Sequence, residues 1–75
     1  MAKLPRLSGK DVLKILSKVG FHVVRQSGSH VILVKETKEG KISTVVPMHS
    51  EIDKGTLLEI IRQAGLTREK CMELV

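Results

Sequence analysis

The sequence predicts an α+β domain in the order α-β-β-β-α, with a three-stranded antiparallel sheet and a short C-terminal helix. Two segments, before residue 20 and after residue 53, carry apolar residues at helical spacing. Between them lie three β-branched or apolar runs joined by short turns, which favour an antiparallel meander. We expect residues 1–75 to form a single domain with one modest core and the helices on one face of the sheet.

The first helix is predicted over residues 9–19. Ser8 is a good N-cap, and Asp11 completes a capping-box pattern with Asp in place of Glu. Gly20 provides the stop. The apolar face of this helix consists of Val12, Ile15, Leu16 and Val19.

Residues 21–26, 30–34 and 41–46 are predicted strands. The first two are joined by the loop 27–29 and the last two by the turn 37–40. Asp53 can cap a second helix, which ends near Gly65 and has its apolar positions at Leu57, Leu58, Ile61 and Ala64. Residues 67–75 are predicted to form a short amphipathic helix. We expect Cys71 in this helix to be a core or rim residue and not a nucleophile.

The net charge of +5 is unevenly distributed along the chain. Residues 1–35 hold seven cations and one anion, for +6, whereas residues 36–75 hold six cations and seven anions, for −1. This asymmetry favours a polyanionic partner, most commonly nucleic acid. A membrane surface is disfavoured, because the basic helix carries no Trp and no second Phe to seat in the interface.

Four cations, spaced four residues apart, form a basic stripe beside the apolar face of the first helix: Arg6, Lys10, Lys14 and Lys18. Such stripes are often only solvated faces. Here only one anion offsets the repulsion among the four cations, so a binding surface is an equally supported interpretation. No apolar run is long enough to span a bilayer, and the N-terminus is too polar for a signal peptide. With one cysteine and therefore no internal disulfide, we expect a cytoplasmic protein.

Three histidines are candidates for chemistry. His30 opens the second strand after Gly28 and Ser29, and His49 lies just past the third. The second strand of a meander begins beside the end of the third, so we expect both imidazoles at one edge of the sheet. We interpret His22, flanked by apolar residues, as structural.

Two neighbouring histidines allow a metal site or general acid–base chemistry. Their spacing from Glu51, Asp53 and Cys71 matches no compact ligand pattern, so we expect no metal. An imidazole can exchange protons near neutral pH, and RNA supplies its own 2′-hydroxyl nucleophile beside the phosphate. Arg25 could then stabilise charge developing on phosphorus. The equal alternative is that His30 only closes the loop by hydrogen bonding.

Phe21 is the only aromatic residue apart from the histidines. Sheets that read single-stranded RNA stack bases on Phe, Tyr or Trp, whereas readers of duplex RNA work through shape, 2′-hydroxyl and phosphate contacts. The helix–sheet order and the basic first helix therefore fit a duplex reader better.

Several motifs occur together, in order, over almost the whole chain. They are Ser8-Gly9-Lys10, Gly20-Phe21, Arg25-Gln26-x-Gly28-Ser29-His30, Val46-Pro47-x-His49, Gly55-Thr56-Leu57 and Ile61-Arg62-Gln63-Ala64-Gly65-Leu66. In these residues the chain resembles the HicA (YcfA-like) toxins, the messenger-RNA-cleaving half of a toxin–antitoxin pair. The turn between the second and third strands and the acidic residues 51–53 depart from the family pattern.

The resemblance implies a double-stranded-RNA-binding-like fold and an endoribonuclease without a cofactor or metal. It implies that His30 is catalytic, that Gly28 and Ser29 position it, and that His49 is a site residue. From the charge pattern, and not from the resemblance, we expect RNA to be bound by Lys10, Lys14, Lys18 and Arg25. It further implies a HicB-type antitoxin as partner.

Two other functions remain open from the residues alone. A non-catalytic module for structured RNA would keep the fold and the basic surface, with the histidines as hydrogen-bonding loop residues. A small partner-binding protein without a nucleic-acid role would leave the charge asymmetry unexplained.

Overall fold

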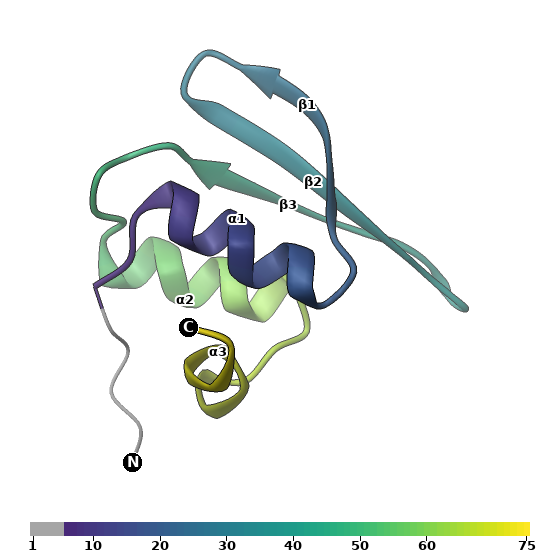
Figure 1. Cartoon of the computed structure of the whole chain (residues 1–75). Helices are drawn as coiled ribbons and strands as arrows, with labels where there is room; N and C mark the ends of the chain where they lie inside the picture. The colour runs from purple at the N-terminus through teal and green to yellow at the C-terminus, as the bar shows by residue number, and fades with distance from the viewer. Residues whose placement is uncertain (1–5) are drawn as a thin grey trace.

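A computed structural model describes residues 6–75 and confirms the predicted order of elements (Figure 1). The three strands form one antiparallel sheet in the order β1-β2-β3. The predicted fold class is therefore correct. The elements are α1 (Gly9–Lys18), β1 (His22–Ser27), β2 (His30–Thr37), β3 (Gly40–Pro47), α2 (Lys54–Gln63) and α3 (Arg68–Leu74).

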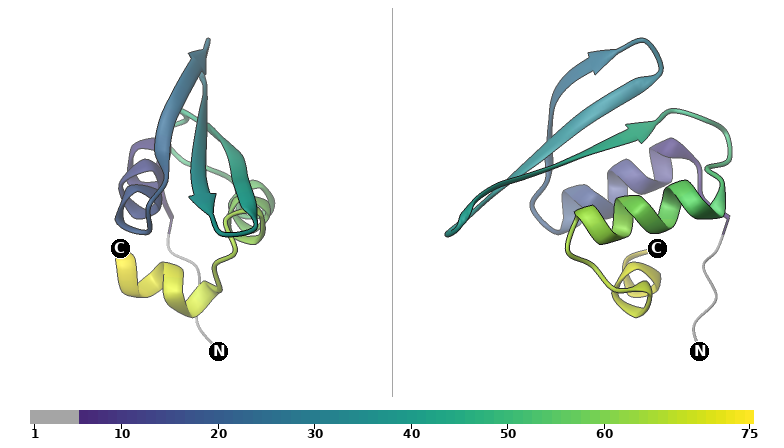
Figure 2. Two further views of the ribbon diagram at one scale, coloured as in Figure 1. Left: turned by 90° about the vertical axis from the view of Figure 1, so that its right-hand side faces the viewer. Right: turned by 180° about the vertical axis from the view of Figure 1, so that it is seen from behind.

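The elements form three layers (Figures 1 and 2). The sheet is the first layer, α1 and α2 lie side by side against one of its faces, and α3 packs on their far side. Both α1 and α2 contact β3, and α3 contacts both of these helices. Within the described residues, the other face of the sheet carries no helix, as predicted. Within residues 6–75, every helix is too short or too polar to cross a membrane.

The core lies between the sheet and the two helices. From the sheet it takes Val31, Leu33 and Val46, which alternate with outward-facing neighbours as the pleat requires. Thr44 is the one buried polar residue in the part of the chain described, and its hydroxyl donates to Oε1 of Gln63 at 2.8 Å. The helices contribute Val12, Ile15, Leu16, Leu57, Ile60, Ile61 and Ala64, while Leu58, predicted for this face, is only half-buried.

The ends of α1 and α2 follow the capping chemistry read from the sequence. The Asp11 amide donates to Oγ of Ser8 at 3.1 Å, and the Ser8 amide donates to Oδ2 of Asp11 at 3.0 Å. Asp53 accepts the Thr56 amide at 3.1 Å at the start of α2. These bonds satisfy backbone donors that the helices themselves leave unpaired.

The second strand is longer than predicted. It continues past Val34 to Thr37, because its backbone stays paired with β3 through the polar residues Lys35 and Glu36. Apolar alternation stops at residue 34, but the backbone ladder does not depend on it. The two strands therefore extend as a ribbon beyond the helices (Figure 1).

The first strand contains a bulge that the sequence did not reveal. Val23 pairs with Leu33 and Arg25 with Ile32, so Val24 is the extra residue between them. All six residues of β1 are exposed, since the helices contact β3 and leave this edge uncovered. Phe21, just before the strand, is nevertheless only 3 % exposed and anchors it to the core.

Candidate active site

The turn between β1 and β2 presents His30. Ser27 pairs with His30, which leaves Gly28 and Ser29 as a two-residue hairpin loop. Gly28 has a φ of +59°, the positive value that type II′ hairpin turns require at their first central position. Because Val31 next to it is buried toward the helices, His30 faces the open side of the sheet, where it is exposed.

Backbone hydrogen bonds bring the segment that carries His49 beside the start of β2, where His30 lies. His30 pairs with Pro47, and the Met48 amide donates to the carbonyl oxygen of Ser29 at 2.6 Å. The juxtaposition expected from the meander is therefore present in the backbone. The loop is closed by this bond and by Nε2 of Gln26, which donates to the Gly28 carbonyl at 3.3 Å.

The N-terminus of α1 holds this segment from the other side. The Gly9 amide donates to the carbonyl oxygen of His49 at 2.9 Å. A Cβ at Gly9 would lie 2.5 Å from the Pro47 carbonyl oxygen and 2.8 Å from Cα of Met48. Only glycine permits this close approach of helix and loop. Gly9 therefore positions residues 47–49.

A shallow depression of about 450 Å³ adjoins His49. Ser8 and Lys10 line it from the start of α1, and Met48 and Ser50 line it from the loop. Lys10 is thus the member of the basic stripe that lines this depression. Its ammonium group and the exposed imidazole of His49 border one concave surface.

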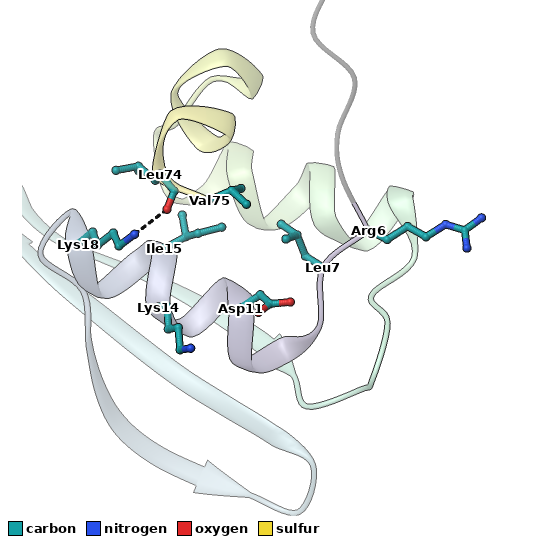
Figure 3. A pocket seen from close by; sticks show the side chains of 8 residues that line it. All are labelled: Arg6, Leu7, Asp11, Lys14, Ile15, Lys18, Leu74 and Val75. Carbon is teal, nitrogen blue, oxygen red and sulfur yellow. Dashed lines mark hydrogen bonds between the residues drawn. The ribbon is translucent and has the colours of Figure 1, made fainter.

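The rest of the basic stripe points elsewhere. Lys14 and Lys18 line a second depression, of about 350 Å³, between α1 and α3 (Figure 3). There Nζ of Lys18 donates to the Leu74 carbonyl oxygen at 2.8 Å, at the end of α3. Arg6 lies before α1 and not on it, with its Nε 3.9 Å from Oε2 of Glu51. Arg6, Lys14 and Lys18 thus border one depression, whereas Lys10 borders the other.

The open face of the sheet holds two further candidate groups. Arg25 pairs with Ile32 and therefore shares the face of His30. His22, which we interpreted as structural, pairs with Val34 and is exposed on that same face. The sequence did not place His22 on this face, because residues 22 and 25 fall on opposite faces of a regular strand and only the bulge at Val24 aligns them.

The remaining titratable candidates have structural surroundings. Oγ1 of Thr56 donates to Oδ1 of Asp53 at 2.8 Å, and the bonds from Thr56 lower the pKa of that carboxyl. Cys71 is 1 % exposed, and burial raises the pKa of its thiol, so its assignment to the core is confirmed. Among residues 6–75, no three His, Cys, Asp or Glu side chains come together in a group that could hold a metal ion.

Comparison with known families gives one result. A family model described as the HicA toxin of bacterial toxin–antitoxin systems matches residues 9–66. The matched span includes α1, the whole sheet with His30, the loop with His49, and α2. No match was found among curated proteins.

Proposed function

The chain belongs to the HicA toxin family, whose members are toxins of toxin–antitoxin pairs and generally ribonucleases, and on this basis we propose that His30 cleaves messenger RNA. The observation that carries the proposal is the placement of His30. Its imidazole stands exposed at the start of the central strand, directly after a tight turn whose backbone is bonded to residue 48. A general acid or base needs this combination of a fixed backbone and an accessible side chain.

The reaction that suits this site uses the 2′-hydroxyl of the RNA. One imidazole removes the 2′ proton as the oxygen attacks the adjacent phosphorus, and the bond from phosphorus to the 5′ oxygen breaks. A proton donor completes the step by protonating the departing 5′ oxygen. His30 takes one of these two roles, and His49, whose segment lies beside the start of β2, is the candidate for the other. The products are a 2′,3′-cyclic phosphate and a 5′-hydroxyl. The reaction as written requires neither a metal nor a cofactor.

Two cations support the chemistry from neighbouring elements. Arg25, on the open face with His30, can stabilise negative charge that develops on the phosphoryl oxygens. Lys10, beside His49, can hold a neighbouring phosphate. Gly28 and Ser29 contribute through the turn that sets the backbone of His30.

Cleavage of RNA in excess chelator, followed by analysis of the product ends, tests the reaction. We expect fragments with 2′,3′-cyclic phosphate and 5′-hydroxyl ends, and no cut at a linkage whose 2′-hydroxyl is replaced by hydrogen. Fragments with 3′-hydroxyl and 5′-phosphate ends, or activity abolished by the chelator, would overturn the mechanism.

A HicB-type antitoxin is the expected protein partner, and we propose that it blocks the surface around His30 and His49. Adding the antitoxin should then stop cleavage and remove RNA from the toxin in the same concentration range. An antitoxin that binds the toxin while RNA stays bound and is cut at the same rate would refute this part of the proposal.

A further inference from the structure

The open face of the sheet gathers three planar, nitrogen-bearing side chains. In β2, Val31 and Leu33 are buried toward the helices, so His30 and its alternate neighbours face outward. Paired residues of an antiparallel ladder share a face. The pairs His22↔Val34, Arg25↔Ile32 and Ser27↔His30 therefore place His22 and Arg25 on the face of His30.

The bulge at Val24 allows His22 and Arg25 to share the face of His30 while Phe21 stays in the core. Phe21 must reach the core at the start of β1, and the hairpin turn fixes the pairing of Ser27 with His30 at its end. In a regular strand, satisfying both ends would be impossible, because the alternation of faces would be out of step by one residue. The extra residue Val24 absorbs the difference.

The surroundings of these three side chains are apolar and free of carboxylates. Next to them on the open face lie Ile32 and Val34, both half-buried, and Val45, which is 44 % exposed. The one acid on this face within the described chain is Glu36, at the far end of the ribbon opposite Lys41. The half of the face that adjoins His30 thus carries one fixed positive charge, on Arg25, beside an apolar centre.

We propose that single-stranded RNA lies along this open face, with His22 and Arg25 receiving the nucleotides next to the one cleaved at His30. The inference rests on the proposed ribonuclease function and adds the path and strandedness of its substrate. Imidazole rings and guanidinium planes are surfaces on which bases stack, and the positive charge of Arg25 also favours phosphate. The strand β1 then offers successive contacts about two residues apart, or roughly 7 Å.

This assignment differs from the duplex mode that the scarcity of aromatic residues suggested. His22, Arg25 and His30 supply planar surfaces without any Tyr or Trp. Bases inside a duplex are stacked on one another and have no free face to offer them. A duplex therefore gains only phosphate contacts from this surface, whereas an unpaired strand gains both phosphate and base contacts.

The test measures binding of a short 2′-O-methyl RNA, which cannot be cut through its 2′ position, as a single strand and as a duplex with its complement. The variants are His22→Ala, Arg25→Ala and His22→Phe, which keeps a planar ring. Lys38→Ala, in the turn at the far end of the ribbon, is the control for loss of one positive charge. Circular dichroism verifies that each variant is folded.

We expect the single strand to bind more tightly than the duplex. His22→Ala and Arg25→Ala should each weaken single-strand binding on the order of tenfold, the effect of losing one stacked base. His22→Phe and Lys38→Ala should stay within about threefold of the parent, because the first keeps the ring and the second loses only a remote exposed charge.

Three results would overturn the inference. Equal affinity for the duplex and for the single strand would refute the assignment of single-stranded RNA as the substrate. Unchanged single-strand affinity in both alanine variants, with the parent still cleaving RNA, would refute the path and leave the ribonuclease function standing. Loss of antitoxin binding alone in these variants would assign the face to the protein partner. A parent protein that neither binds nor cuts RNA would refute the ribonuclease function itself.

Discussion

At the scale of single residues, Gly9 has the largest predicted effect outside the reacting groups. Gly9→Ala would place a methyl group against the backbone of Pro47 and Met48, which cannot yield without moving the loop of His49. We expect a loss of about 1–3 kcal/mol in the free energy of unfolding, typical of overpacking. Cleavage should fall at least about tenfold as well, because small displacements of reacting groups are costly.

Gly55→Ala is the matched control for this prediction. A Cβ at Gly55, in the first turn of α2, would meet only Oδ2 of Asp53 at 3.4 Å. Alanine favours a helix over glycine by up to about 1 kcal/mol, so this variant should be as stable as the parent or more stable. Denaturant unfolding and the cleavage rate check both variants. Equal behaviour of the two would show that Gly9 has no positioning role.

The bulge is also a residue-scale feature, and it marks the limit of the sequence-based prediction of the site. His30 and His49 could be placed from strand order, because antiparallel pairing alone brings the two segments together. His22 could not, since the stretch 22–27 has no clear alternation from which a register shift could be read. Its face is decided by the anchoring of Phe21 far from the turn.

At the scale of elements, the capped helices predict how stability depends on pH. Hydrogen bonds from Ser8 lower the pKa of Asp11, and those from Thr56 lower the pKa of Asp53. A carboxyl with a lowered folded-state pKa stabilises the fold above its unfolded value, near 3.8, and this contribution is lost as the pH falls through the folded value. Stability should therefore fall below about pH 4.

Asp11→Asn and Asp53→Asn test this linkage. An asparagine can cap a helix but does not titrate, so each variant should show a weaker dependence of the free energy of unfolding on pH between about pH 5 and pH 2. Urea unfolding at a series of pH values measures the slopes. Slopes identical to that of the parent would show that these carboxyls do not govern the acid response.

The lysines of α1 contact two different parts of the molecule, and their four-residue spacing did not predict which lysine contacts which part. Lys18 binds the C-terminal end of α3 (Figure 3), whereas Lys10 borders the depression beside His49. Periodicity predicted that these cations share a stripe, but which neighbour each one meets depends on the packing of α3, which involves residues 56 positions apart in the chain.

Exchanging each lysine for alanine should separate these roles. Lys10→Ala should weaken RNA binding roughly threefold to fivefold, the size of one exposed charge contact, with little change in stability. Lys18→Ala should instead lower the free energy of unfolding by about 0.3–1 kcal/mol, because a cation near the end of α3 is lost. Anisotropy titrations and denaturant unfolding provide the two readouts. The reverse pattern would contradict the assignment.

At the scale of the whole molecule, the layered fold explains why the side chain of His30 is exposed. Within residues 6–75, the helices cover one face of the sheet and hold the core, and no helix lies on the face that carries His30 (Figure 2). The layer order followed from helical and strand periodicities that are strong in this chain. The extension of β2 and β3 past the helices could not be predicted from these periodicities, because the backbone pairing continues through polar residues.

The account as a whole depends on His30 acting as a chemical group and not as a binding group. The most direct measurement is the single-turnover cleavage rate of His30→Ala against the parent, with the affinity of each for uncleavable RNA measured beside it. We predict a rate lower by about 10²–10⁴-fold, the usual contribution of a general acid or base. The affinity should stay within about tenfold of the parent, the typical effect of one lost stacking contact at His30. Equal cleavage rates for the two proteins, or a rate loss that saturating RNA restores, would contradict the account.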